Sequence, residues 1–369
     1  MAKNSPNLLM NRIDMTSGSA TSAGDMLARL LAWARLRGSL DLRCRMQQHF
    51  WLPHDQAPAG VALFHTVLRG GCRLGLPDGR WLALRQGEMV VLPRGLAHAL
   101  APLEGDLHAT AGEDDTQRPL QTGDWLPLRT NMSGADQACA ADSMDLVCGR
   151  FVHEGEAGQL LLQALPDVLV LGGEPEAPLA QGLQVVRVPL VWPQDMPHAG
   201  EVLHPVLALV QLLRQEAMAA QPAALAMADV LTQALLLYML RAYAQSPDAH
   251  RIPGVFNILA EPRLRPVVQA MWQQPGEDWS LDRLAALAAM SRATFTRHFA
   301  AHAGMSPWNF LIQLRMLQGM EWLRDRRYSI ARIAAMTGYR SESAFNVAFR
   351  KYSGQTPARY RREHGLAES

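Results

Sequence analysis

Apolar residues recur at helical spacing in two similar stretches near the C-terminal end of the chain. The first, LDRLAALAAMSRATFTRHF, covers residues 281–299, and the second, SIARIAAMTGYRSESAFNVAF, covers residues 329–349. In each stretch a short amphipathic helix is followed by a break, a serine and a second helix. Ser291 and Ser341 are placed to cap the second helices, because a serine hydroxyl accepts from free backbone N–H groups. The pattern predicts two helix-turn-helix units in tandem.

A longer apolar stripe joins the two units. Residues 306–325, SPWNFLIQLRMLQGMEWLRD, begin with Ser306 as a capping residue and Pro307 at the first helical position. A helix of that length spans roughly 30 Å at about 1.5 Å per residue. This is close to the roughly 34 Å between successive major-groove faces on one side of B-DNA. We therefore expect a rigid helix that presents both units to DNA.

The tandem units, the joining helix and the tail GYRSESAFNVAFRKYSGQTPARYR resemble the DNA-binding domain of the AraC/XylS family of transcription regulators. By this resemblance, Ala293, Thr296 and Arg297 face bases from the first recognition helix, with Arg292 near the DNA backbone. The corresponding set in the second recognition helix is Glu342, Ser343, Asn346 and Val347, where Val347 stands at a position that is basic in many relatives. Arg297 is suited to pair with guanine, which offers two acceptors to a guanidinium, and a phosphate contact is the alternative.

Short strand-like runs broken by turns dominate the chain from residue 40 to about residue 107. A Pro-Asp-Gly turn at 77–79 separates two such runs and is a hairpin signal. The string from Gly87 through Pro93 and Gly95 to His98 resembles a motif of the cupin barrel, which is the N-terminal sensing domain in this regulator family. The predicted fold class is therefore α+β multidomain, with a cupin-like β-barrel, flanking helices and a C-terminal all-α domain.

A metal is the tempting inference from a cupin. His65, His98 and His108 are the candidate ligands, but the paired His-x-His and the glutamate of metal cupins are missing. Scattered histidines are more often hydrogen-bonded barrel residues. We therefore expect no metal and no cofactor, and a pocket lined by His65 and His98 that is dry or filled by a small molecule.

Four cysteines, at positions 44, 72, 139 and 148, lack the Cys-x-x-Cys spacing of a zinc or redox motif. Cys44 stands among arginines in DLRCRM, where positive charge would lower its pKa. The strings GSLDLRC…WLPH and LVCGRF also resemble family members that respond to reactive chlorine species, and Cys44 and Cys148 fall on matching positions. Redox sensing by these two thiols and a purely structural role stay open as alternatives.

Charge is divided unevenly along the chain. Residues 1–250 hold 18 Lys/Arg against 25 Asp/Glu, a net −7, whereas residues 251–369 hold 17 against 9, a net +8. A basic domain beside an acidic body is typical of a DNA-binding protein with a separate sensing module. No apolar run of transmembrane length or signal segment is evident, which predicts a cytoplasmic protein without membrane contact.

Four segments follow from these patterns. Residues 1–23 are expected to be a disordered extension, 24–245 the sensing and dimerisation domain, 246–260 a linker and 261–369 the DNA-binding domain. Residues 109–143 read as a polar loop inserted into the barrel. Residues 224–242 are too apolar for a free surface helix, and we expect them to pack on the barrel or to form a dimer contact.

The chain is thus predicted to be a transcription regulator and not an enzyme. Its expected partners are double-stranded DNA, a second copy of the chain, and an oxidant or small-molecule effector, with RNA polymerase as a further candidate. Two alternatives remain: a cupin enzyme fused to a DNA-binding domain, and a dimeric regulator that responds to no ligand. Activation of transcription is expected by resemblance, although the residues themselves do not distinguish it from repression.

Overall fold

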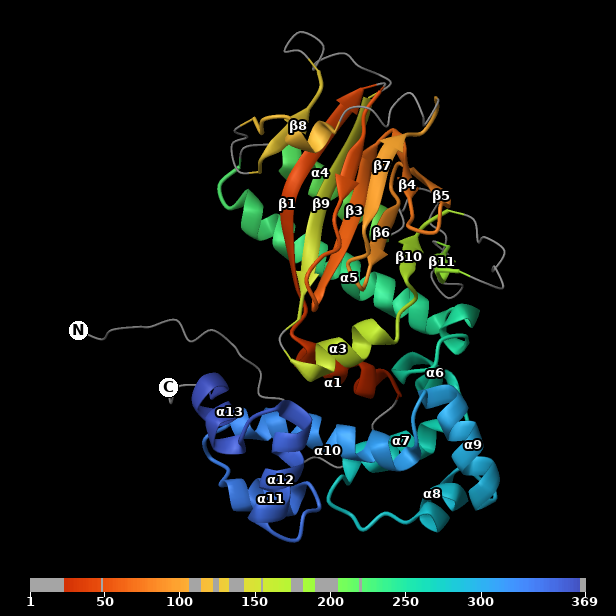
Figure 1. Cartoon of the computed structure of the whole chain (residues 1–369), viewed down its shortest axis with the longest axis vertical. Helices are drawn as coiled ribbons and strands as arrows, with labels where there is room; N and C mark the ends of the chain where they lie inside the picture. The colour runs from red at the N-terminus through yellow and green to blue at the C-terminus, as the bar shows by residue number, and fades with distance from the viewer. Residues whose placement is uncertain are drawn as a thin grey trace, which may run out of the picture.

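The molecule has a β-rich N-terminal part and an all-helical C-terminal part, as Figure 1 shows. The computed structural model describes residues 23–47, 49–105, 114–121, 126–132, 143–153, 155–173, 182–189, 205–218 and 221–365. The extension predicted over residues 1–23 lies outside this part except for its last residue. Much of the insertion predicted over residues 109–143 lies outside it too. The predicted fold class is confirmed.

Two sheets face each other in the N-terminal part. The larger has the order β11-β10-β6-β3-β9-β1-β8 and the smaller β2-β7-β4-β5. Strands of the larger sheet are β1 (Arg37–Gln47), β3 (Val61–Arg69), β6 (Met89–Leu92), β8 (Leu128–Thr130), β9 (Ser143–Val152), β10 (Val168–Leu171) and β11 (Val185–Val188). Strands of the smaller sheet are β2 (Leu52–His54), β4 (Gly71–Gly75), β5 (Trp81–Arg85) and β7 (His98–Pro102). Alternate side chains point between the sheets and form one apolar core.

Helices pack on the larger sheet and, in the view of Figure 1, lie below its lower end. They are α1 (Ala23–Ala34), α3 (Glu156–Gln163), α4 (Pro205–Met218) and α5 (Ala224–Gln245), and a short 3-10 helix η1 (Asp115–Gln117) lies near β2. Contrary to the sequence expectation, α5 is long and apolar enough to cross a membrane by length and composition, with a mean hydropathy of 1.4. It packs against α4 and β1, however, and 44% of its most apolar window is buried. These contacts are those of a core helix, and they agree with the prediction that residues 224–242 pack on the barrel.

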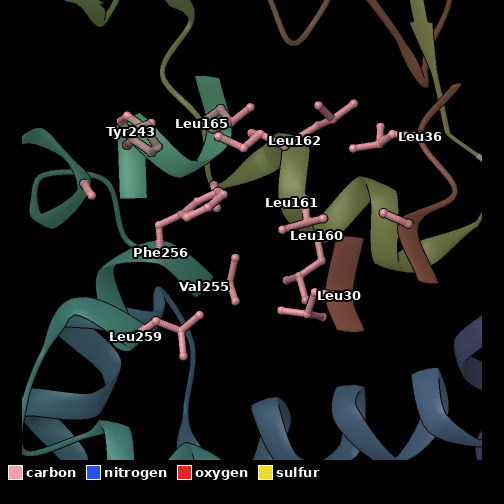
Figure 2. Packing of buried hydrophobic residues seen from close by; sticks show 14 of the residues in the cluster. Leu30, Leu36, Leu160, Leu161, Leu162, Leu165, Tyr243, Val255, Phe256 and Leu259 are labelled. Atoms are coloured by element: carbon pink, nitrogen blue, oxygen red, sulfur yellow. The ribbon is translucent and has the colours of Figure 1, made fainter. Parts of the chain in front are cut away.

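The expected linker, residues 246–260, is folded over most of its length. It contains the 3-10 helix η3 (Pro247–His250) and the helix α6 (Val255–Ala260), whose side chains are largely buried. The Phe256 ring meets that of Tyr243 edge-on, with centroids 5.4 Å apart. Figure 2 shows these rings close to the leucines of α3 and to Val255 and Leu259 of α6. A continuous apolar core therefore connects the two parts of the molecule.

The C-terminal part contains the two predicted helix-turn-helix units. Its helices are α7 (Arg265–Gln273), α8 (Leu281–Leu287), α9 (Arg292–Ala303), α10 (Pro307–Arg324), α11 (Ile330–Met336), α12 (Glu342–Ser353) and α13 (Pro357–His364). The first unit is α8–α9 and the second is α11–α12, and α10 runs between them (Figure 1). The 18 residues of α10 give it a length of about 27 Å.

Candidate functional site

The recognition helices α9 and α12 begin in the same way. The Ser291 hydroxyl accepts from the Thr294 backbone N–H at 3.2 Å, and the Ser341 hydroxyl accepts from the Ala344 N–H at 3.1 Å. Each bond satisfies a donor that has no partner inside the helix. Both predicted caps are confirmed, and they fix where each recognition helix starts.

The two recognition helices also share one burial pattern. In each, the exposed first turn is followed by a buried phenylalanine, a half-buried residue, an exposed residue, another half-buried residue and a second buried phenylalanine. Of the residues predicted to meet DNA, Arg292, Ala293, Arg297, Glu342 and Ser343 are exposed, and Thr296 and Asn346 are half-buried. The helices thus present all of these residues on accessible surface, and their individual contacts with DNA stay predictions.

Two of these side chains in α9 already have intramolecular partners. The Thr296 hydroxyl donates to the Arg292 carbonyl at 2.9 Å, and the Arg292 guanidinium lies 3.3 Å from the Asp282 carboxylate on α8. Among the described residues, none holds the Arg297 guanidinium in a hydrogen bond or ion pair. The Arg297 guanidinium is therefore available to a base or phosphate.

A second candidate site lies inside the barrel, where cross-strand pairs from the two sheets meet. His65 on β3 is directly opposite Cys148 on β9 in the larger sheet, and His54 on β2 is directly opposite His98 on β7 in the smaller sheet. His65 Nδ1 lies 3.1 Å from Cys148 Sγ, and His65 Nε2 lies 2.7 Å from His98 Nε2. The His54 and His98 rings stack at 4.5 Å. We call these four residues the thiol–imidazole cluster.

The backbone fixes the protons in the cluster. His98 Nδ1 lies 2.7 Å from the Leu96 carbonyl, which only accepts, so this nitrogen carries the proton. In a neutral ring His98 Nε2 is then the acceptor, so His65 Nε2 donates to it. The remaining nitrogen, His65 Nδ1, accepts from the Cys148 thiol. The result is a hydrogen-bonded chain from the thiol through both imidazoles to a backbone carbonyl.

Burial keeps this chain neutral. It lowers the pKa of His98 to about 3 and, with the neighbouring His98 and His54 rings, holds the pKa of His65 well below its usual value. Burial also lowers the pKa of His54. The neighbouring Cys44 thiol, together with burial, holds the pKa of Cys148 well above its usual value. Around neutral pH, Cys148 is consequently a thiol and the imidazoles are uncharged.

Cys44 does not have the environment that its sequence neighbours predict. It lies on β1, is 1% exposed and contacts Cys148, which is a diagonal neighbour across the β1–β9 pair. Because side chains alternate along a strand, the adjacent arginines project to the other face. There Arg43 is bound to Asp145, with Nε donating at 2.8 Å. The arginines next to Cys44 in sequence therefore lie on the opposite face of the strand, and activation of Cys44 by their charge stays a prediction.

The structure brings together Cys44, Cys148, His65 and His98, which are all the sensing residues that the sequence nominates. The structure also places His54 in this cluster. The only signal for His54 in the sequence is the string WLPH, which supports the resemblance to chlorine-responsive regulators but was not interpreted as part of a site. Cys72 is also buried in this core, and burial raises its pKa to about 12. The candidate ligand His108 and the fourth cysteine, Cys139, lie outside the described residues.

Two groups of side chains in the described part of the chain have the spacing to hold a metal ion. One comprises His54, His65 and Cys148 in the barrel, and the other Glu261, His298 and His302 around α9. The glutamate within the cupin-like string does not contribute to either group. Glu88 instead accepts from the Arg85 backbone N–H at 2.9 Å and lies 3.4 Å from the Arg187 guanidinium.

Comparisons with known proteins agree with this arrangement. A cupin family model matches residues 25–188, and a helix-turn-helix domain model matches residues 284–363. An uncharacterised helix-turn-helix transcriptional regulator of Haemophilus influenzae is 28% identical and covers 93% of this chain and 100% of its own length. The RCS-specific transcriptional activator RclR of Escherichia coli is 25% identical, covering 91% of this chain and 97% of its own. These relatives are transcription regulators and not enzymes.

Among solved structures, the DNA-binding domain of AdpA, in complex with a target DNA, is 36% identical to this chain. The match covers 28% of this chain and 92% of that domain, with a TM-score of 0.26. Together, the two domain models and the relatives that match over nearly their full length show that the chain is an AraC-type DNA-binding transcription regulator with an N-terminal cupin domain.

Proposed function

We propose that this regulator senses a hypochlorite-type oxidant through Cys44 and Cys148, and that oxidation changes DNA binding by its C-terminal domain. The observation that supports the proposal is the contact between two buried thiols, one of which also donates to an imidazole. The E. coli relative is an RCS-specific activator, and its similarity covers 91% of this chain.

The cluster supplies what the reaction needs. As Cys148 sulfur attacks the chlorine of hypochlorous acid, an S–Cl bond forms and the O–Cl bond breaks. The thiol proton, accepted by His65 Nδ1, joins the departing hydroxide as water. Cys44 sulfur then displaces chloride from Cys148, which forms a disulfide and releases the Cys44 proton. The two thiols lose two electrons and the chlorine is reduced to chloride.

The packing of the molecule offers a route from the thiols to the DNA-binding helices. Cys44 lies on β1, against which α5 packs, and α5 contacts α6 through Tyr243 and Phe256. Helix α6 in turn packs on the recognition helix α9. A disulfide that changes the local pairing of β1 and β9 would shift the balance between two arrangements of these helices.

The test is DNA binding by reduced and hypochlorite-treated full-length protein on its own upstream region. We expect treatment to remove two hydrogens from the mass of the protein and to change affinity or footprint, and a thiol reductant to reverse both. Cys44→Ser and Cys148→Ser should abolish the response. Cys72→Ser is the matched control, since Cys72 lies in the same core but makes no hydrogen bond to any imidazole that the structure describes. It should respond as the unaltered protein does. Equal binding by all samples would refute oxidant sensing.

A second candidate effector is a small apolar molecule. A pocket of about 820 Å³ lies where helices of both parts meet, between α1, α5, α6 and α7. Its walls include Leu31, Leu237 and Phe256, and Arg241 and Arg265 lie at its edge. A ligand here would touch the sensing and the DNA-binding parts together. If hypochlorite has no effect, a screen for ligands that raise the melting temperature, repeated with Leu237→Arg, tests this alternative.

We also propose that the regulator is a homodimer through α5. Large apolar side chains stay exposed on this helix, namely Leu225, Met227, Val230 and Leu237. Exposed apolar patches of this kind mark interaction surfaces. Val230, which is 65% exposed, is the most accessible of them. Val230→Glu should convert a dimer, measured by analytical ultracentrifugation, to a monomer, and an unchanged mass would exclude this interface.

A further inference from the structure

Three side chains of the thiol–imidazole cluster converge on one point inside the barrel. One ligand atom from each of His54, His65 and Cys148 lies within 4.8 Å of the other two. Ligands on a tetrahedral zinc ion, at about 2.0–2.3 Å from the metal, are separated by less than this distance, so a small inward shift closes the site. We infer that His54, His65 and Cys148 bind one zinc ion.

The imidazoles are prepared for this role by their hydrogen bonds. His54 Nδ1 lies 3.0 Å from the Leu52 carbonyl and donates to it, which leaves His54 Nε2 as a free lone pair. His65 Nε2 donates to His98, which leaves His65 Nδ1 beside the Cys148 sulfur. Metal-binding histidines almost always have such a partner on the second nitrogen, because it fixes the tautomer and the ring orientation. His98 would thus support His65 rather than bind the metal.

This donor set differs from that of metal cupins, which combine a paired His-x-His with a glutamate. Here one thiol and two imidazoles come from three strands, β2, β3 and β9, and Glu88 is engaged by Arg187. Thiolate and imidazole are the ligands that zinc prefers, whereas magnesium and calcium prefer oxygen. The chemistry of the three donors therefore selects a borderline-soft ion.

Binding has a defined proton balance. The Cys148 S–H bond breaks, an S–Zn bond forms and one proton is released to solvent, so affinity should rise with pH. The site leaves a coordination position for water, because three protein ligands face a metal that usually takes four. The inference does not depend on oxidant sensing, since a bound ion could stabilise the barrel whether or not Cys148 reacts.

The group around α9 is the natural competitor for metal and serves as an internal control. His298 and His302 are one helical turn apart, and their Nε2 atoms lie 3.4 and 3.7 Å from Glu261. This group has no sulfur and is partly exposed. Metal held there would give no thiolate spectrum, so the two locations are distinguishable.

The experiment titrates cobalt(II) into reduced, chelator-treated full-length protein and then competes with zinc(II). We expect one cobalt per chain with a thiolate-to-cobalt charge-transfer band, displaced by one equivalent of zinc. His54→Ala and Cys148→Ser should each abolish the band, and His98→Ala should weaken binding about 10–100-fold by removing the support of His65. His302→Ala should leave the band unchanged.

Circular dichroism shows whether each variant folds. His54 is only half-buried, so His54→Ala is the variant that should disturb folding least. The inference is overturned if the reduced protein gives no charge-transfer band. It is overturned equally if folded His54→Ala binds cobalt as the unaltered protein does, or if His302→Ala removes the band.

Discussion

The two helix-turn-helix units have the same construction but different surfaces. Each has a serine cap and a pair of buried phenylalanines, Phe295 with Phe299 and Phe345 with Phe349. At the equivalent exposed position, however, the first unit has Arg297 and the second has Val347, which is 69% exposed. An arginine can read or clamp DNA, whereas a valine offers only apolar contact. We therefore propose that the first unit specifies sequence and that the second chiefly positions the protein.

The two units also differ in the apolar core to which their buried phenylalanines belong. Phe295 and Phe299 belong to the apolar core that continues through α6 and α5 to the sensing domain. Phe345 and Phe349 belong to a separate core with α11 and α13. Helix α10 contributes one set of side chains to each core. The apolar core of the sensing domain is therefore continuous with that of the first unit, and α10 joins it to the core of the second unit.

The largest effect, on the free energy of unfolding, should come from removing one buried phenylalanine ring from each core. Phe299→Ala and Phe349→Ala should each cost about 3–5 kcal/mol, because each removes a buried ring and leaves a cavity. Phe299→Ala should reduce protection from hydrogen exchange in the sensing domain too, while Phe349→Ala should affect mainly residues 329–365. Native-state exchange followed by mass spectrometry measures both. Equal loss of protection across the chain in the two variants would contradict separate cores.

The next largest effect is on DNA affinity and concerns the equivalent surface positions 297 and 347. Arg297→Ala should weaken binding to a selected operator by about 1–3 kcal/mol, or roughly 5–150-fold, if the guanidinium pairs with guanine. Val347→Ala is the matched control and should change affinity by less than about twofold, since it removes no hydrogen bond. Fluorescence anisotropy with specific and random DNA separates the roles. Equal loss on both DNAs after Arg297→Ala would mean a phosphate contact.

The smallest effect concerns the feature that the units share. Ser291→Ala and Ser341→Ala should each lower the free energy of unfolding by about 1 kcal/mol, since each leaves a backbone N–H at the helix start without its partner. Replacement by glycine should cost only a few tenths of a kcal/mol. Urea unfolding followed by circular dichroism can resolve these values. A cost for one serine only would show that the two caps are not equivalent.

The sequence predicted the helical domain better than the barrel for a physical reason. Caps and apolar spacing act within a few residues, so the Ser291 and Ser341 caps and the two helix-turn-helix units could be predicted from the chain alone. The thiol–imidazole cluster depends on strand pairs formed between distant residues, such as His54 with His98 and His65 with Cys148. The arginines next to Cys44 in sequence illustrate the same point, because alternation along β1 places them on the opposite face of the strand.

The folded segment between the domains was missed on similar grounds. Residues 246–260 contain Pro and Gly and lack the length for a clear helical period. Yet Val255, Phe256 and Leu259 are buried against helices from both parts. Only tertiary packing makes so short a helix stable.

The central claim is that the first unit specifies sequence while the second positions the protein. The most direct measurement is an operator scan, in which each base pair of a selected site is replaced in turn and affinity is measured for the unaltered protein, Arg297→Ala and Val347→Ala. We predict that Arg297→Ala removes the sensitivity at one or two base pairs in a single groove segment, and that Val347→Ala leaves the whole profile intact. The account would be contradicted if Arg297→Ala lowered the affinity equally for every base-pair replacement. It would also be contradicted if Val347→Ala removed the sensitivity to base pairs in the other groove segment.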